Sequence, residues 1–306
     1  MKSSKIKVGL ALGGGGARGL AHIGVVKVLI QAGIPIHCIA GTSMGAIVGG
    51  AFALSGDINS IERRARELPQ KVPEIEQLSS LKSLSKDQRP AVKRLFGFIK
   101  EIYLLNMGMR KKWLIDCKDV FPLLEEVLNS KSFTDLKLPF AAVATDLQTG
   151  EELVLTDGPL MPAVFASMAI PGIFEPVVKD DRLLVDGGVT SLVPVDAVKQ
   201  LGANFVIAVN VEAGIFRRDF QRGIDILFQV DDIRGSELNR LKLAQADVVI
   251  TPEIRHINWA QFSKVQECIH RGEEAARQKL PEIQEKLAAK RRKLFWKRFI
   301  PFRMTA

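Results

Sequence analysis

Two glycine-rich turns near the N-terminus carry the residues with the most potential for chemistry. The second turn, Gly41-Thr42-Ser43-Met44-Gly45, fits the pattern G-x-S-x-G, in which a serine occupies a tight bend between a strand and a helix. The flanks agree, because residues 35–40 are apolar enough for a buried strand and residues 46–54 are the small residues of a helix. The pattern predicts that Ser43 is a nucleophile. A glycine-lined turn with an incidental serine is the alternative.

The first turn spans residues 13–19 and follows another apolar run. Its glycines also match the dinucleotide fingerprint G-x-G-x-x-G, which requires an acidic residue about 20 positions further on. No Asp or Glu occurs between Gly19 and Ser55, and no Lys-Ser or Lys-Thr pair follows the glycines, so the dinucleotide and phosphate-loop interpretations both fail. What remains is a set of backbone N–H donors for an oxyanion, with Arg18 as a nearby cation.

A serine nucleophile needs a base, and the sequence contains only four histidines. His37 precedes Ser43 on the same expected strand, too far along an extended chain to reach it. The other three are expected to be surface or core residues: His22, His256 and His270.

Asp186 is the carboxylate best placed to act as that base. It ends an apolar run and precedes two glycines, a position where catalytic groups collect in open α/β sheets. An Asp with an ordinary pKa of about 3.9 is a poor base, so a catalytic Asp186 requires a confined site. A simple Asp-Gly turn is the alternative.

These pieces, in this order, resemble the patatin-like phospholipase family, and most of all its bacterial single-domain members of the RssA type. The similarity covers roughly residues 6–255. It is carried by the oxyanion motif at 14–19, the nucleophile elbow at 41–45, the motif Asp186-Gly187-Gly188, and two further blocks at 144–151 and 166–174.

The resemblance implies a catalytic Ser-Asp dyad without histidine, in which Ser43 is the nucleophile and Asp186 the proton acceptor. It assigns the oxyanion hole to Gly14, Gly15, Gly16, Arg18 and Gly19, and adds Gly41, Gly45, Gly187 and Gly188 as motif positions. The implied fold is a three-layer α/β/α sandwich with a mainly parallel central sheet.

The activity implied by the resemblance is that of a serine lipid acyl hydrolase, a phospholipase A or lysophospholipase type of carboxylic ester hydrolase that works through an acyl-enzyme. Its substrate would be a phospholipid or a lysophospholipid. Two alternatives stay open. One is an acyltransferase or thioesterase on the same dyad, and the other is a membrane-associated regulatory protein with little turnover.

The expected organisation is a patatin-like domain over residues 6–255, with a helical insertion at about 57–137, followed by a C-terminal helical region at 256–306. Within the insertion, residues 91–105 mix cations with many apolar side chains, and a basic triplet at 110–112 precedes Trp113. We interpret this segment as a cover that shields an acyl chain or contacts a bilayer. A core-packing pair of helices is an equal alternative.

The net charge of +9 is concentrated at the C-terminus. The basic positions of this tail are Lys290, Arg291, Arg292, Lys293, Lys297, Arg298 and Arg303, interleaved with Phe295, Trp296, Phe299, Ile300 and Phe302. This composition predicts peripheral contact with an anionic membrane. A disordered basic end or a docking segment for a protein partner are the alternatives. No nucleic acid is expected, because no recognition motif accompanies the charge.

Other features bound the cellular context. Cys38, Cys117 and Cys268 are odd in number and widely spaced, which predicts reduced thiols in a cytoplasmic protein. The apolar run at 8–12 is too short for a signal peptide, and no stretch reaches the about 18 apolar residues of a membrane span. We therefore expect a chain that is not secreted and attaches peripherally to the cytoplasmic membrane face. No metal or other cofactor is expected, Asp180-Asp181 is expected to be a hairpin turn, and the oligomeric state is left open.

Overall fold

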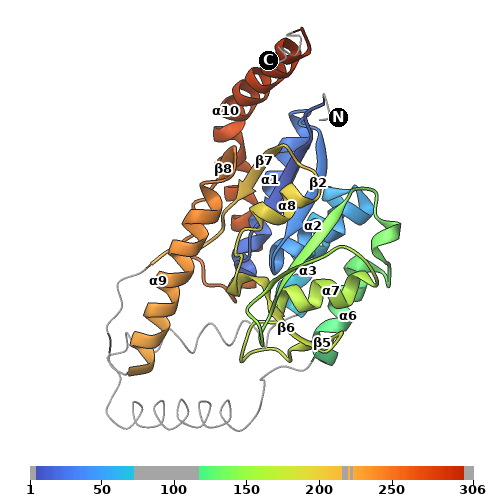
Figure 1. Cartoon of the computed structure of the whole chain (residues 1–306). Helices are drawn as coiled ribbons and strands as arrows, with labels where there is room; N and C mark the ends of the chain where they lie inside the picture. The colour runs from blue at the N-terminus through green and yellow to red at the C-terminus, as the bar shows by residue number, and fades with distance from the viewer. Residues whose placement is uncertain (1–4, 72–116, 216–219, 221–222, 300–306) are drawn as a thin grey trace, which may run out of the picture.

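The structure is a computed structural model that describes residues 5–71, 117–215, 220 and 223–299. Its centre is an eight-stranded sheet in the order β5-β6-β3-β2-β1-β7-β8, with β4 paired to β3 (Figure 1). The strands are β1 (Val8–Leu12), β2 (Ile36–Gly41), β3 (Phe140–Asp146), β4 (Glu152–Leu155), β5 (Val177–Lys179), β6 (Arg182–Asp186), β7 (Phe205–Val209) and β8 (Val248–Ile250). The five strands β3, β2, β1, β7 and β8 run parallel, whereas β4, β5 and β6 join by antiparallel pairing.

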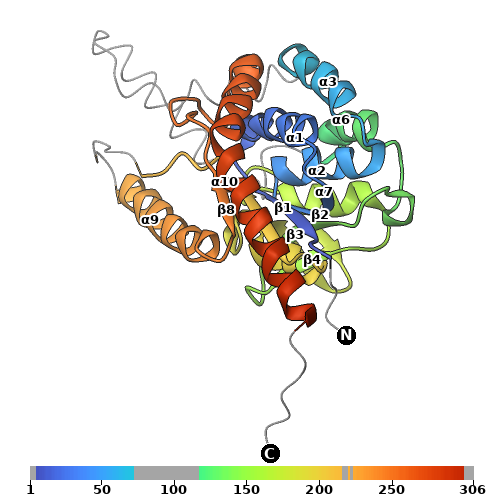
Figure 2. The same ribbon diagram turned by 90° about the horizontal axis from the view of Figure 1, so that it is seen from above.

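Helices cover both faces of this sheet, which confirms the predicted three-layer α/β/α fold (Figures 1 and 2). The helices are α1 (Ala21–Gln31), α2 (Met44–Ser55), α3 (Ile58–Lys71), α6 (Cys117–Leu128), α7 (Leu160–Met168), α8 (Val195–Gln200), α9 (Gly223–Leu243) and α10 (Val265–Phe299). The larger core lies between the sheet and the layer of α1, α2, α7 and α10. The smaller core lies beneath α8.

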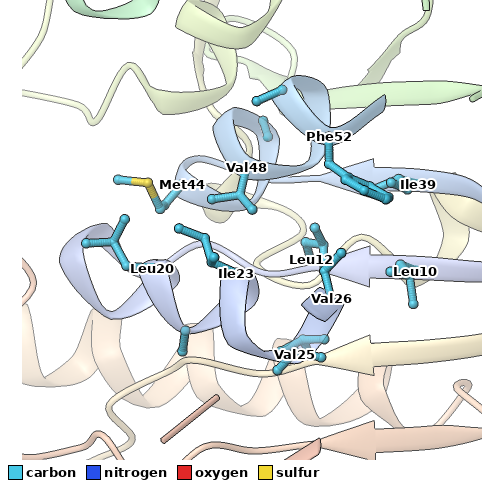
Figure 3. Close-up of a cluster of buried hydrophobic side chains, with 14 of the residues drawn as sticks. Leu10, Leu12, Leu20, Ile23, Val25, Val26, Ile39, Met44, Val48 and Phe52 are labelled. Carbon is cyan, nitrogen blue, oxygen red and sulfur yellow. The ribbon is translucent and has the colours of Figure 1, made fainter. Parts of the chain in front are cut away.

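The two cores differ because alternate residues of β1 face opposite sides of the sheet. Leu10 and Leu12 point into the larger core, where Leu12 and Met44 lie in the cluster between α1 and α2 (Figure 3). On the other side β1 presents Gly9 and Ala11, and a Cβ at Gly9 would lie 2.5 Å from the Cβ of Ala203. Met44 directly follows Ser43, so the larger core anchors the end of the serine turn.

A close crossing of α1 and α10 fixes the helix that follows the first glycine turn. A Cβ at Gly24 would lie 2.0 Å from the carbonyl oxygen of Ile269, and one at Gly272 would lie 2.0 Å from that of Ala21. Only glycine permits this approach of the two backbones. The sequence analysis did not identify either position, because nothing local marks a contact between segments so far apart in the chain.

The carboxyl ends of the parallel strands meet at one edge of the sheet, which we call the carboxyl edge. In the register of β1 and β2, Leu12 lies opposite Gly41, so the two glycine turns leave the sheet side by side. Open α/β sheets bind their ligands at this edge.

The predicted insertion is described only at its two ends, by α3 and α6. Residues 91–105 and 110–113 lie outside the described residues, so the interpretation of this segment and the domain boundaries stay predictions. Within the described ranges, every helix is too short or too polar to cross a bilayer.

Candidate active site

Ser43 occupies the bend between β2 and α2, in the strand-turn-helix context that the sequence predicted. Its backbone has φ 55° and ψ −123°, a conformation that costs a non-glycine residue free energy and is found mainly at functional sites. The flanking glycines are required by close packing. A Cβ at Gly41 would lie 2.3 Å from the carbonyl oxygen of Gly45, and one at Gly45 would lie 2.1 Å from that of Leu12.

Ser167, near the end of α7, holds the strained Ser43 backbone in place. The amide of Ser43 donates to both the carbonyl oxygen of Ser167, at 3.0 Å, and its Oγ, at 3.1 Å. The hydroxyl of Ser167 in turn donates to the carbonyl oxygen of Val143 at 2.6 Å. The sequence indicated the block at 166–174 only through the family resemblance, with no role for it. The structure shows that this block positions Ser43.

The same block also positions Asp186. The amide of Asp186 donates to the carbonyl oxygen of Ala169 at 2.9 Å, and β6 pairs with β3 so that Asp186 lies opposite Ala144. The following glycine is needed for this pairing, because a Cβ at Gly187 would lie 2.2 Å from the carbonyl oxygen of Val143. Two residues far apart in the chain thus meet through one short segment at the end of α7.

The side chains of Ser43 and Asp186 form a buried pair. Each residue is only 7% exposed, and the Ser43 hydroxyl donates a hydrogen bond to the Asp186 carboxylate. The amide of Gly188 donates to Oδ1 of the same carboxylate at 2.7 Å. Burial raises the pKa of Asp186 from its ordinary 3.8 to about 6, because the charged form loses hydration, although the hydrogen bonds from Gly188 and Ser43 lower it.

The first glycine turn lies next to Ser43. A Cβ at Gly14 would be 3.2 Å from the Cβ of Ser43, a tight contact, so the loop lies close to Ser43. The Gly14 amide donates to the carbonyl oxygen of Leu192 at 2.9 Å and is therefore not available to an oxyanion, which differs from the sequence prediction. The amides of Gly15, Gly16 and Met44 donate to no acceptor among the described residues.

Arg18 and Gly19 shape the loop in ways that the sequence analysis did not anticipate. The Arg18 side chain is turned away to brace two loops: its Nε donates to the carbonyl oxygen of Val211 at 3.0 Å and an Nη to that of Ile257 at 3.2 Å. Burial lowers the pKa of Arg18. A Cβ at Gly19 would lie 2.5 Å from the Cβ of Met44, so this glycine allows the loop to pack against α2.

His22 forms a hydrogen bond with the first glycine turn. It is fully buried in α1, and its Nε2 lies 2.7 Å from the carbonyl oxygen of Gly13. Because a carbonyl only accepts, Nε2 carries the proton, and Nδ1 is left without a partner among the described residues. Burial lowers the pKa of His22 to about 4, so the ring is neutral at neutral pH.

The remaining histidines have partners elsewhere. His37 accepts from the amide of Val8 at the start of β1, His256 contacts Glu267 at 2.7 Å, and His270 contacts Glu274 at 3.2 Å. No described histidine contact reaches the Ser43 hydroxyl. In the described ranges, no group of three or more His, Cys, Asp or Glu residues is arranged to hold a metal ion.

Two predictions away from the dyad are also resolved. Asp180 and Asp181 have positive φ values of 50° and 60° and join β5 to β6, which confirms the predicted hairpin turn. Cys38 and Cys268 are free and buried.

Comparison with known proteins identifies the family of this chain. A sequence model of the family described as patatin-like phospholipase matches residues 10–199. An NTE family protein of Mycobacterium tuberculosis is 34% identical over 215 residues, which cover 69% of this chain and 52% of that protein. Patatin-like phospholipase domain-containing protein 7 of Rattus norvegicus is 32% identical over 206 residues, which cover 67% of this chain and 13% of the rat protein.

This chain thus spans about half the length of its mycobacterial relative. Among solved structures, VipD from Legionella pneumophila has a TM-score of 0.42 at 16% identity, over 88% of this chain and 67% of that one, which is too distant to add to the argument. The resemblance to the RssA type stays a prediction. The family match covers more than half of the chain, including both glycine turns and Asp186, and we conclude that the chain belongs to the patatin-like phospholipase family.

Proposed function

We propose that this chain is a lipid acyl hydrolase, a phospholipase A or lysophospholipase type of carboxylic ester hydrolase with Ser43 as nucleophile and Asp186 as proton acceptor. The observation that carries the proposal is the buried hydrogen bond between the Ser43 hydroxyl and an Asp186 carboxylate whose pKa is raised to about 6. A carboxylate with this pKa is a better general base at neutral pH than an ordinary Asp, yet is still mostly ionised.

In the first step, Ser43 Oγ attacks the acyl carbon of the ester and passes its proton to Asp186. The negative charge that develops on the carbonyl oxygen needs nearby donors. We assign this role to the unpartnered amides of Gly15, Gly16 and Met44, of which Met44 lies at the first turn of α2, where the helix dipole favours an anion. One such donor is typically worth about 3–4 kcal/mol of the barrier.

The acyl-enzyme then forms and is hydrolysed. Asp186 returns the proton to the leaving alcohol oxygen as the carbon–oxygen bond breaks, which leaves the acyl group on Ser43. A water molecule then loses a proton to Asp186 and attacks the acyl carbon, and Ser43 recovers its proton as the fatty acid departs. No histidine takes part in this sequence. We expect the rate to fall as the pH drops through about 6, because protonated Asp186 cannot accept a proton.

Turnover of a short-chain nitrophenyl ester tests the dyad. Ser43→Ala and Asp186→Asn are each expected to lower kcat by about 10,000-fold or more, the scale seen when members of a catalytic serine constellation are removed. Matched controls are Ser130→Ala, whose hydroxyl contacts only Glu125, and Asp181→Asn in the hairpin turn. Full activity in either dyad variant would contradict the assignment.

Product analysis separates hydrolysis from transfer. With a phospholipid substrate, we expect free fatty acid as the main product even when an acceptor alcohol or thiol is added. Predominant transfer to the acceptor would favour the acyltransferase or thioesterase alternative. Fluorophosphonate labelling of Ser43 without lipid turnover would favour the regulatory alternative.

We also propose that the chain is cytoplasmic and contacts anionic membranes through its basic tail. The exposed side chain of Phe295 supports this contact. The Lys290 ammonium instead contacts the Phe205 ring, the carbonyl oxygen of Asn204 and the carboxylate of Asp247 on the body of the protein. Residues 300–306 lie outside the described residues. Co-sedimentation with anionic vesicles should weaken in a chain that ends at Ala289, and equal sedimentation of both forms would exclude the tail as an anchor.

A further inference from the structure

Two polar residues near the C-terminal end of α9 face the body of the protein. Asn239 is buried, and its amide donates to Glu212 at 2.6 Å and to Asn210 at 3.2 Å. Lys242 forms ion pairs with Glu152 at 2.9 Å and Asp196 at 2.7 Å. These contacts fix the rotation of the helix about its own axis.

The opposite face of α9 exposes apolar side chains to solvent. They recur at spacings of three and four residues along the helix, which places them on one side. We call this set the α9 stripe; it consists of Ile226, Leu227, Val230, Ile233, Leu238 and Leu241. Leu227 is 65% exposed and Leu241 is 56% exposed. The inward polar contacts prevent the helix from turning this stripe toward the core.

The topology places the start of α9 at the carboxyl edge. The helix is the crossover between the parallel strands β7 and β8, so it runs from the carboxyl edge toward the opposite edge. Strand β7, which precedes α9, is hydrogen-bonded to the first glycine turn, because the Gly13 amide donates to the carbonyl oxygen of Val209 at 3.1 Å. Figures 1 and 2 both show α9 at the side of the molecule, apart from the sheet.

Further exposed apolar residues lie near the same edge. Leu147 directly follows β3 and is half-exposed, and Val189 lies just after Asp186. By contrast, α10 runs away from the carboxyl edge, and its C-terminal end lies at the opposite end of the molecule in Figure 1. The exposed apolar residues of α9 thus start on the side of the proposed active site.

The charges on α9 indicate what kind of surface the stripe fits. The helix carries acidic residues at Asp225, Asp231, Asp232 and Glu237, and basic residues at Arg234, Arg240 and Lys242. Lys242 forms an ion pair with Asp196 on the body of the protein, and Arg240 pairs with Glu237 at 3.0 Å. Because no basic excess remains, anionic head groups are not favoured, and an electrically neutral lipid surface fits better.

The size of the stripe argues against a second copy of the chain as its partner. A helix of 21 residues is about 32 Å long, and one face about 10 Å wide covers roughly 300 Å². A stable protein interface buries about 800 Å² on each partner. A lipid surface requires no such complementary area, because an apolar helix face lies in the head-group and acyl boundary.

We propose that the α9 stripe is a lipid-contacting surface for zwitterionic bilayers, which brings the carboxyl edge close to the membrane. This inference rests on the proposed lipid hydrolase function, since an active site for membrane lipids must approach the bilayer that contains them. Its contact differs in place and in charge preference from that proposed for the basic tail.

Co-sedimentation of the full chain with phosphatidylcholine vesicles tests the surface. The double variant Ile226→Ser and Leu227→Ser is expected to weaken the vesicle partition coefficient about tenfold or more, because two exposed aliphatic side chains no longer enter the bilayer. The matched control is Ile30→Ser, at the end of α1, because Ile30 is exposed and lies away from the carboxyl edge. This control should bind like the parent chain.

A second measurement avoids dependence on the double variant. A Leu227→Cys chain carrying an environment-sensitive fluorophore, in a Cys117→Ser background, should shift its emission to the blue when vesicles are added. Cys38 and Cys268 are buried and should not be labelled. An unchanged spectrum would overturn the proposal, as would equal vesicle binding by the stripe variant and the parent chain.

Two further readouts distinguish the possible failures. Hydrolysis of a short, water-soluble ester should be unchanged in the stripe variant, since the stripe does not touch the dyad. If the parent chain lacks this esterase activity but binds vesicles through the stripe, the proposed hydrolase function fails and the lipid-contacting surface stands. Analytical ultracentrifugation detects self-association. A parent dimer that becomes a monomer in the stripe variant, with vesicle binding unchanged, would assign the stripe to a second copy and overturn the lipid proposal.

Discussion

The Ser43 turn and the start of α9 both lie at the carboxyl edge of the sheet but differ in how the surrounding structure accommodates them. Around Ser43, glycines are packed against backbone atoms, and a strained backbone is held by hydrogen bonds that the Ser43 amide donates to Ser167. Along α9, glycines have open space around them and apolar side chains face solvent. The contrast indicates that the turn is built for fixed geometry, whereas the outer face of α9 is suited to a surface outside the protein.

The same substitution should have opposite effects in the two regions, and the largest is expected at the turn. In Gly45→Ala the new Cβ would lie 2.1 Å from the carbonyl oxygen of Leu12, a backbone atom that cannot move without disturbing β1. We expect a loss of about 3 kcal/mol or more in the free energy of unfolding, at the upper end for overpacked sites, together with loss of esterase activity. Urea unfolding measures the stability change; a parent-like midpoint would show that the turn is less tightly packed than described.

The second effect concerns the cost of burying Asp186. Its pKa is about 6 in the folded protein and about 3.8 when unfolded, so the native state binds more protons between these values and stability falls as the pH rises through them. Above pH 6 the full cost is present. Asp186→Asn should therefore be more stable than the parent by about 1–3 kcal/mol at pH 8, and the difference should shrink toward pH 4. Thermal unfolding at both pH values measures this, and a pH-independent difference would argue against a raised pKa.

A smaller effect is expected at Ser167. Ser167→Ala removes one of the two acceptors of the Ser43 amide and the hydrogen bond to Val143, but leaves the carbonyl acceptor in place. We expect kcat for a short ester to fall about 10- to 100-fold with little change in KM, because the nucleophile is less well oriented. Ser167→Thr, which keeps the hydroxyl, should recover part of the loss. Equal rates in all three proteins would exclude a positioning role.

The smallest expected change in stability is in α9. A Cβ at Gly235 would meet no atom within 4 Å, and the residue lies inside the helix. Gly235→Ala should raise the free energy of unfolding by about 0.5–1 kcal/mol, because alanine is the better helix former. Urea unfolding should show this small gain beside the large loss in Gly45→Ala. A loss at Gly235 would indicate that something packs against this part of α9.

Local spacing was enough to predict the turns that carry the site residues but not the contacts that support them. The G-x-S-x-G bend, the Asp-Gly-Gly motif and the turn at Asp180-Asp181 are each set by a few consecutive residues, and these elements could be predicted from sequence. Which groups of the first glycine turn are available as donors could not be predicted from sequence. The Gly14 amide donates to Leu192, and Arg18 donates to Val211 and Ile257, and these partners are all distant in the chain.

The orientation of α9 was also beyond the sequence. Its apolar spacing alone would suit a core-facing helix, and only the partners of Asn239 and Lys242 show that the stripe faces outward. The crossing glycines Gly24 and Gly272 were missed for a similar reason, because each is explained by a carbonyl group of the other helix. Contacts of this kind depend on tertiary structure rather than on local pattern.

The central claim, a Ser43 nucleophile activated by Asp186, is tested most directly by the rate of fluorophosphonate labelling, followed by intact-mass and peptide mass spectrometry. We predict one label per chain, on Ser43, at a rate that rises as the pH passes through about 6 and that is strongly reduced in Asp186→Asn. Labelling of a different residue, or a parent-like rate in Asp186→Asn, would contradict the account.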